Sequence, residues 1–293
     1  MTNIPSNVVD KFKTNSKDDV FEVRDHFLYR NGVQVPYYPH EKRDARSTIN
    51  VKFFTFHFTA GRDNIVSTAN WLNDHKTKAD VQLIMDRSGN IVQMAPLNEK
   101  CWHMGRSEYK GYTGLNSHAT GIEVINPGPL ELIQPGLYKT WFGKYYHTDE
   151  YANKEGATSQ YAPGIQYMPH HLHPSGNKGW LPYTESQTEV LKRVATAICD
   201  YYDAEFIGHD ETTPRKTDPG PISPLARIRD YLSIERTQDG SPESTTETPL
   251  PSATSYNRAS NPFGENLDQL NLGSLADIKP INILGKVKRF FRR

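Results

Sequence analysis

The hydrophobic pattern of the chain switches repeatedly between strand-like and helix-like segments up to about residue 235. Several short segments alternate apolar with polar side chains, or run apolar for a few positions, and end at Gly, Asn or Pro, which is typical of strands. We expect such strands, some of them paired as hairpins, at 26–35, 53–61, 81–85, 91–94, 120–125 and 206–208. The hairpin at 26–35 would turn at Asn31 and Gly32, a favoured two-residue turn.

Helical periodicity separates these strands. Thr184 and Gln187 form a capping box ahead of apolar residues at helical spacing, which predicts a helix beginning there. Asp63 is expected to cap an earlier helix, and Ser223 and Pro224 to begin a later one. Strands interleaved with helices predict an α/β (α+β) domain, in which helices flank a mixed central β-sheet.

Two stretches interrupt this pattern. Residues 127–182 are rich in Gly, Pro, Tyr and His and show little periodicity, so we predict an irregular functional insertion or lid there. Beyond residue 235 a Ser/Thr/Pro/Glu-rich segment without apolar periodicity is typical of a disordered linker. The predicted organisation is a leader at 1–20, a domain at 21–235, a flexible linker at 236–278 and a basic tail at 279–293.

Charge and cysteine content narrow the function classes. The 293 residues include 34 basic and 34 acidic side chains, so no overall positive field favours nucleic acid as a partner. Cys101 and Cys199 are too few for a disulfide framework and fit synthesis in a reducing compartment. The first residues lack the apolar run of a signal peptide, and no segment reaches the roughly 18 to 20 apolar residues of a transmembrane helix. We therefore expect cytoplasmic synthesis without a signal peptide.

The predicted tail at 279–293 carries six basic residues and no acidic residue. A helix over this stretch would gather its apolar side chains on one face, namely Ile283, Leu284, Val287, Phe290 and Phe291. Such a basic amphipathic helix fits an anionic membrane or lipopolysaccharide surface. A docking peptide for another protein and a solvated tail without a role remain alternatives, because Gly285 weakens the helix.

Candidate metal ligands occur in two distant segments. His57 lies near the end of the strand expected at 53–61, and the turn-rich loop 208–220 carries His209 and Asp218. A lone histidine at a strand end is more often hydrogen-bonded scaffold than ligand. Two imidazoles and one carboxylate together, however, are a ligand set that catalytic Zn²⁺ uses while keeping a position open for water.

A second histidine cluster, His170, His171 and His173, is a weaker candidate for a metal site. It lies within the insertion, and the sequence shows no carboxylate partnered with it. We therefore expect no metal ion at this cluster.

Five motifs, in order, resemble the zinc-dependent N-acetylmuramoyl-L-alanine amidases of the type 2 superfamily. That superfamily includes muropeptide-recycling amidases, phage endolysins and peptidoglycan-recognition proteins. The resemblance spans about residues 50–232, and its motifs are His57–Gly61, Cys101–Gly105, Asn116, Gly121–Glu123 and Gly208–Gly220.

The resemblance implies that His57, His209 and Asp218 bind Zn²⁺. It further implies that zinc-activated water cleaves the amide between N-acetylmuramic acid and L-alanine in peptidoglycan. Glu123 matches the catalytic carboxylate, which carries the proton from the water to the leaving amine, and Lys216 matches the lysine that stabilises the oxyanion. Without the family, Glu123 would be taken as a solvent-facing strand residue and Lys216 as an ordinary exposed lysine.

Substrate contacts are expected from four residues of the matched motifs: Trp102, His103, Asn116 and Arg215. For Trp102 and His103 the alternative is simple packing.

Two departures from the family pattern stand out. Pro214 directly precedes Arg215, which shortens the ligand loop by one residue and is expected to alter the ligand geometry. Val81 occupies the place of a tyrosine in the phage lysozyme branch, which favours Glu123 as the catalytic group.

These features predict a phage lytic or virion-associated enzyme that acts on the cell wall. Two alternatives remain: a non-catalytic peptidoglycan-binding module, and a structural component of a phage particle with local wall-degrading activity. In both phage hypotheses the tail at 279–293 would contact either an anionic envelope surface or a phage structural protein.

Overall fold

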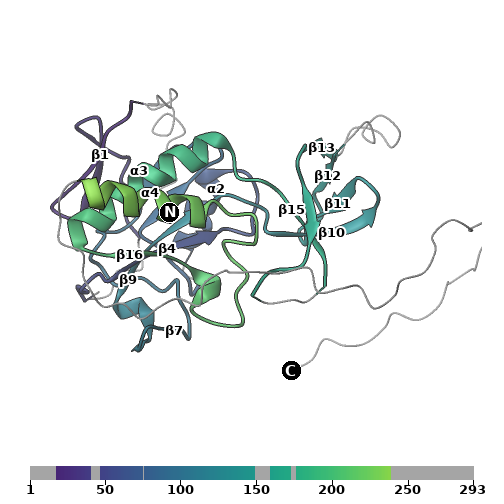
Figure 1. Cartoon of the computed structure of the whole chain (residues 1–293). Coiled ribbons are helices and arrows are strands. Elements are labelled where there is room, and N and C mark those ends of the chain that lie inside the picture. Colours follow the sequence, from purple (N-terminus) through teal and green to yellow (C-terminus); the bar gives the residue numbers. More distant parts are fainter. Residues whose placement is uncertain (1–17, 41–46, 75, 149–158, 173–175, 239–293) are drawn as a thin grey trace, which may run out of the picture. The chain divides into compact units, whose positions relative to one another are not determined.

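A mixed β-sheet lies at the centre of the structure (Figure 1). The computed structural model describes residues 18–40, 47–74, 76–148, 159–172 and 176–238. Within these ranges the sheet has the order β16 (Glu205–Gly208), β4 (Phe53–Phe58), β9 (Ala119–Val124), β5 (Leu83–Met85) and β6 (Ile91–Gln93). Neighbouring strands are parallel except for the β5–β6 hairpin. The expected α/β class with a mixed sheet is confirmed.

The two faces of the sheet have different roles, because side chains alternate along each strand. Phe54 and Phe56 of β4 pack in the largest apolar cluster, together with helices α3 (Glu185–Tyr202) and α4 (Leu225–Gln238). Helix α2 (Ile65–Asn73) packs on the opposite face, over β5 and β6. His57, at odd spacing from Phe54 and Phe56, therefore lies on the α2 side and away from α3.

The predicted helix starts are largely correct. The capping box of Thr184 and Gln187 is present, and α4 begins directly after Pro224. The cap of α2 is Asn64 and not the predicted Asp63. Asn64 has an extended backbone, and its side-chain oxygen accepts the Ser67 N–H at 2.8 Å, the third residue onward, which is the reach of an N-cap.

The N-terminal part of the domain is a small sheet of β1 (Phe21–Arg24), β2 (Phe27–Arg30) and β3 (Val33–Gln34). The predicted hairpin turn forms at Asn31 and Gly32, whose φ angles of 51° and 75° suit the type of turn that joins twisted strands. Gln93 of β6 connects this sheet to the central one. Its side chain accepts the Leu28 N–H at 2.8 Å and donates to the carbonyl of His26 at 3.1 Å.

The prediction that residues 127–182 are irregular is wrong. Their described part forms a second sheet in the order β13 (Ser159–Tyr161), β12 (Tyr145–His147), β11 (Leu137–Lys139), β10 (Pro129–Gln134), β15 (Lys178–Trp180) and β14 (Gln166–Met168). Most of these strands have three residues, too few to show alternation. In addition, β10 pairs with the distant β15, so no local hairpin pattern marks the pairing.

The segment between β6 and β9 holds a short ladder of β7 (Glu108–Tyr109) and β8 (Tyr112–Thr113) and a 3₁₀ turn, η2 (Leu115–Ser117). A further 3₁₀ turn, η4 (His209–Glu211), follows β16. No helix among the described residues has the length and apolar character needed to cross a membrane. Most of the predicted leader, nearly all of the linker and the whole basic tail lie outside the described residues.

We predict that Gln93→Ala destabilises the fold by about 2–4 kcal/mol, because backbone groups next to and within the N-terminal sheet lose a side-chain hydrogen bond. Besides the bonds to Leu28 and His26, the substitution removes a 2.8 Å bond to the carbonyl of Ala95. Urea unfolding of Gln166→Ala, an exposed glutamine of β14, serves as control and should differ from wild type by less than about 0.5 kcal/mol. Equal stabilities of the two variants would contradict this role of Gln93.

Candidate metal centre and catalytic groove

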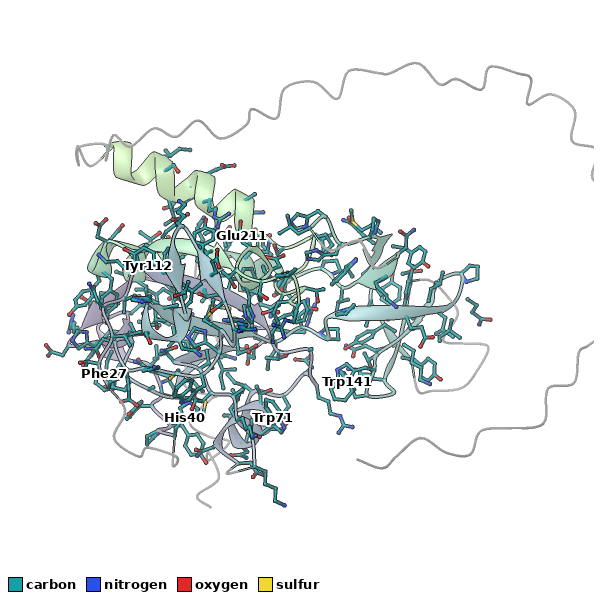
Figure 2. The ribbon with its side chains drawn as sticks, turned by 90° about the horizontal axis from the view of Figure 1, so that it is seen from below. Phe27, His40, Trp71, Tyr112, Trp141 and Glu211 are labelled. Carbon is teal, nitrogen blue, oxygen red and sulfur yellow. The ribbon has the colours of Figure 1, made fainter. Side chains whose placement is uncertain are left out.

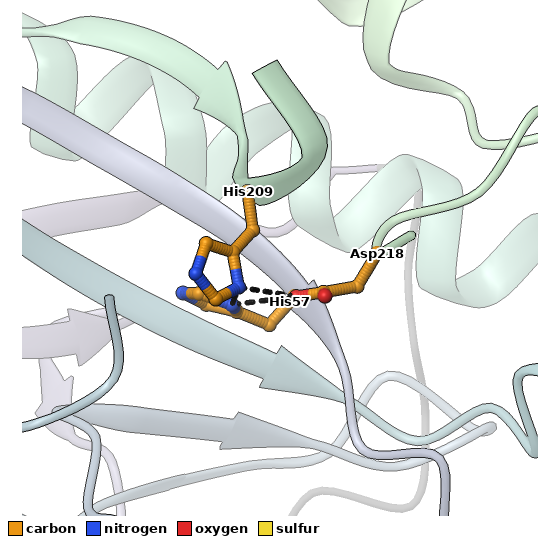
Figure 3. Close-up of side chains that lie close together, drawn as sticks. All are labelled: His57, His209 and Asp218. Atoms are coloured by element: carbon orange, nitrogen blue, oxygen red, sulfur yellow. Dashed lines mark hydrogen bonds and ion pairs between the residues drawn. The ribbon is translucent and has the colours of Figure 1, made fainter. Parts of the chain in front are cut away.

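Three buried side chains meet at the carboxyl ends of two adjacent parallel strands (Figure 3). His57 lies near the end of β4, His209 directly follows β16, and Asp218 lies in the next loop. The two histidine Nδ1 atoms are 3.0 Å apart, and each is 2.8 Å from Oδ2 of Asp218. The structure thus brings together the three residues predicted as metal ligands. The ligand loop, although shortened at Pro214, still delivers its carboxylate to both imidazoles.

Hydrogen bonds on the far side of each ring fix where the protons lie. Nε2 of His209 donates to the carbonyl oxygen of Met104 at 3.1 Å, and Nε2 of His103 donates to that of Ala119 at 3.2 Å. Nδ1 of His103 is therefore an acceptor, and it takes the Nε2–H of His57 at 3.0 Å. Nδ1 of His57 and Nδ1 of His209 are therefore left with lone pairs. Acceptors behind the imidazole rings fix the tautomer in the same way in metal sites.

The electrostatics of the cluster favour this protonation. Burial and the neighbouring His209 lower the pKa of His57 to about 4, so its imidazole is neutral at neutral pH. Burial acts to raise the pKa of Asp218, but His209 and His57 outweigh it and hold that pKa well below its ordinary range. With both Nε2 atoms donating outward, two imidazole lone pairs and a carboxylate oxygen face one another with no proton between them. A divalent metal ion supplies positive charge at this place, so these residues fit one.

Gly121 makes room for the ring that supports His57. A Cβ at position 121 would lie 2.7 Å from Nδ1 and 2.8 Å from Cε1 of His103. The buried Asn116 holds the same segment from the other side, since its Oδ1 accepts the N–H of His103 at 3.0 Å and of Met104 at 2.8 Å. Direct substrate contact by His103 and Asn116 stays a prediction. The support that His103 and Asn116 give to His57 was not predicted, because sequence motifs do not tell which ring lies behind a metal ligand.

Glu123 stands beside the cluster, on the neighbouring strand. It is paired with His57 in the register of β9 and β4, and both side chains lie on the same face of the sheet. Burial and the Asp218 carboxylate raise the pKa of Glu123 well above its usual range, while Lys216 acts to lower it. Its Oε2 is buried without a hydrogen-bond partner in the described structure. A carboxylate with a raised pKa and a spare oxygen is suited to carry a proton during catalysis.

Glu123 also borders a cavity of about 470 Å³, between α2 and the insertion.

Lys216 is exposed, and its charge acts to lower the pKa values of both His57 and Glu123. Arg215 is exposed too and lines a different cavity of about 410 Å³, together with Arg106. Trp102 is half exposed at 52%, with the Lys100 ammonium 4.7 Å from the centre of its ring. Substrate contact by Arg215 and Trp102 stays a prediction.

The second histidine cluster does have a carboxylate nearby, contrary to the sequence argument. Nε2 of His170 lies 3.0 Å from Oδ2 of Asp210, the residue after His209, and His173 lies outside the described residues. Nδ1 of His170 accepts the Leu172 N–H at 3.2 Å, so Nε2 carries the proton and donates it to Asp210. This contact links the insertion to the ligand loop. The ligand atoms of His170, His171 and Asp210 also lie close enough together for a metal ion, so the absence of a metal here stays a prediction.

Comparison with known proteins gives consistent matches. A family model described as N-acetylmuramoyl-L-alanine amidase matches residues 47–221. The 1,6-anhydro-N-acetylmuramyl-L-alanine amidase AmpD of Escherichia coli is 26% identical over 164 residues, which cover 55% of this chain and 62% of AmpD. The N-acetylmuramoyl-L-alanine amidase AmiD of Escherichia coli is 24% identical over 197 residues, covering 64% of this chain and 55% of AmiD.

Among solved structures, one similar structure is the complex of Escherichia coli AmiD with the substrate anhydro-N-acetylmuramic acid-L-Ala-D-gamma-Glu-L-Lys. It has 20% sequence identity and a TM-score of 0.44, and the match covers 73% of this chain and 65% of that one. The chain spans less than two thirds of the length of each of these matched proteins.

We predict that Gly121→Ala weakens divalent-metal binding by about 10- to 100-fold, because the new methyl group displaces the His103 ring that holds His57 in its tautomer. Competition with a chromophoric chelator measures the affinity. Gly61→Ala is the matched control, since its Cβ would meet its nearest atom at 3.5 Å, an ordinary contact, and should leave the affinity unchanged. Equal affinities for both variants would show that His103 does not support the metal ligand.

Proposed function

Since this chain belongs to the N-acetylmuramoyl-L-alanine amidase family, we propose that it hydrolyses the amide between N-acetylmuramic acid and L-alanine in peptidoglycan. One observation carries the proposal. Nδ1 of His57, Nδ1 of His209 and Oδ2 of Asp218 lie close enough together to bind one metal ion, and Glu123 is on the neighbouring strand. All four residues fall within the segment 47–221 that matches the family.

The metal ion in this proposal is Zn²⁺, which the two imidazoles and the carboxylate would hold. When bound, zinc supplies a Lewis acid that polarises a carbonyl group and activates water at neutral pH. His103 and Met104 orient the two imidazoles through their Nε2 atoms. Their hydrogen bonds keep both Nδ1 lone pairs directed at the ion and away from competing donors.

The remaining chemistry belongs to Glu123 and Lys216. Oε2 of Glu123, which has no hydrogen-bond partner in the described structure, accepts a proton from the attacking water and delivers it to the nitrogen of the leaving L-alanine. The Lys216 ammonium stabilises the negative charge that develops on the carbonyl oxygen. Its exposure on the ligand loop suits this role, because a substrate approaches from solvent.

We further propose that the substrate is the cell wall and that the protein serves a phage, as a lytic or virion-associated enzyme. The support is the predicted basic amphipathic stretch 279–293, which fits an anionic envelope surface or a phage structural protein and lies outside the described residues. Mass spectrometry of purified particles tests the choice. Presence of the chain in particles favours a virion component, and its absence a free lytic enzyme.

We predict that Asp218→Ala abolishes both zinc binding and hydrolysis, because the site loses its only anionic ligand. Chelator treatment should inactivate the wild type and lower its Tm, and added Zn²⁺ should restore both properties in the wild type alone. Asp200→Ala, an exposed position of α3, is the control and should keep metal and activity. Full activity of the metal-free wild type would exclude the zinc mechanism.

We predict that Glu123→Gln keeps its zinc and its affinity for sacculi but loses about 10²- to 10⁴-fold in rate, because the amide has the same shape and cannot accept the proton. The assay is the release of new L-alanine amino groups from purified sacculi. Glu131→Gln, at an exposed position of β10, should match the wild type. A wild type that binds zinc and sacculi but releases no amino groups would identify the chain as a non-catalytic peptidoglycan-binding module.

A further inference from the structure

Two exposed tryptophans stand at the cavity that Glu123 borders. Trp71 lies on α2 and Trp141 in the turn between β11 and β12 of the insertion (Figure 2). Both line this cavity of about 470 Å³. Their side chains are 60% and 77% exposed. Large apolar surface left open at a cavity is a mark of ligand-binding grooves.

The position of Trp141 is fixed by contacts with the segment that follows His57. Its Nε1–H donates to the carbonyl oxygen of Ala60 at 2.6 Å, so the polar end of the indole is held while its ring stays exposed. The next residue, Phe142, packs edge-on against it, and the Arg62 guanidinium lies 5.7 Å from the centre of the Phe142 ring. The insertion therefore builds one wall of the cavity from a held aromatic surface.

The polar groups of this cavity narrow the chemistry of its ligand. Besides the charged Arg62 and Glu123, its polar lining consists of hydroxyl side chains beside the apolar indole rings, namely Thr59, Ser67 and Thr68. A pyranose ring combines the same two properties, since its C–H faces are apolar and its edge carries hydroxyl and acetamido groups. The other cavity is lined by two arginines, Arg106 and Arg215, and one glutamate, Glu108, so its net positive charge matches the carboxylates of a stem peptide better.

We propose that Trp71 and Trp141 form a saccharide-binding subsite, which holds amino-sugar rings of the glycan strand and leads the muramoyl residue to Glu123. This inference rests on the proposed function and specifies its substrate, namely a glycan strand of several sugars in preference to a muropeptide with a single sugar. The insertion then contributes to substrate choice through Trp141, which the hairpin between β11 and β12 carries to the groove.

The test measures binding separately from cleavage. Peptide-free glycan strands are titrated into the full-length protein by calorimetry, with Trp71→Ala, Trp141→Ala, the double variant and Trp141→Phe. Each alanine variant should raise the Kd about tenfold, as loss of a central tryptophan does at binding sites. Trp141→Phe should keep most of the affinity, because it retains an aromatic face and loses only the bond to Ala60. Tyr201→Ala, an exposed aromatic of α3 outside the cavity, should bind as the wild type does.

Hydrolysis supplies the second measurement. On sacculi the alanine variants should raise KM and leave kcat unchanged, whereas hydrolysis of a muramoyl-tripeptide that carries only one sugar should change much less. Unchanged glycan binding in the double variant, or an equal loss with free stem peptide as ligand, would overturn the subsite. A wild type that fails to cleave sacculi yet binds glycan through both tryptophans would refute the amidase proposal and leave the subsite standing.

Discussion

Three atoms with lone pairs, held within 3.0 Å of one another in a buried site, impose the main constraint on this structure. Nδ1 of His57, Nδ1 of His209 and Oδ2 of Asp218 are stable together only with positive charge between them. The surrounding hydrogen bonds prevent a change of tautomer in either imidazole, because Nε2 of His57 and Nε2 of His209 already donate to fixed acceptors. The site is thereby prepared for a cation by the protein itself, before any ion binds.

That preparation extends through several layers of the fold. The His57 proton is accepted by His103, the His103 ring depends on the missing side chain of Gly121, and Asn116 fixes the backbone on which His103 sits. The parallel pairing of β4 and β9 sets Glu123 next to His57 on the same face. Alternation along β4 separates this polar face from the packed phenylalanines, so the core and the site share strands without sharing side chains.

Two of the contacts between the insertion and the rest of the domain lie close to the metal ligands. His170 binds Asp210 beside a metal ligand, and Trp141 binds Ala60 in the segment after His57. The sheet of the insertion also has its own small apolar cluster. An added sheet of this kind can change which substrate enters the groove without disturbing the ligands.

Local sequence determined the parts of this protein that depend on neighbouring residues. The Asn31–Gly32 turn, the Thr184 capping box and the strand that ends near His57 follow from short-range backbone preferences. The family resemblance added the set of His57, His209 and Asp218. The sequence missed what depends on contacts between distant segments: the sheet within 127–182, the support of His57 by His103 and the carboxylate partner of His170. Only the tertiary structure decided these, because strand pairing and ring contacts join residues whose separation along the chain leaves no periodic signal.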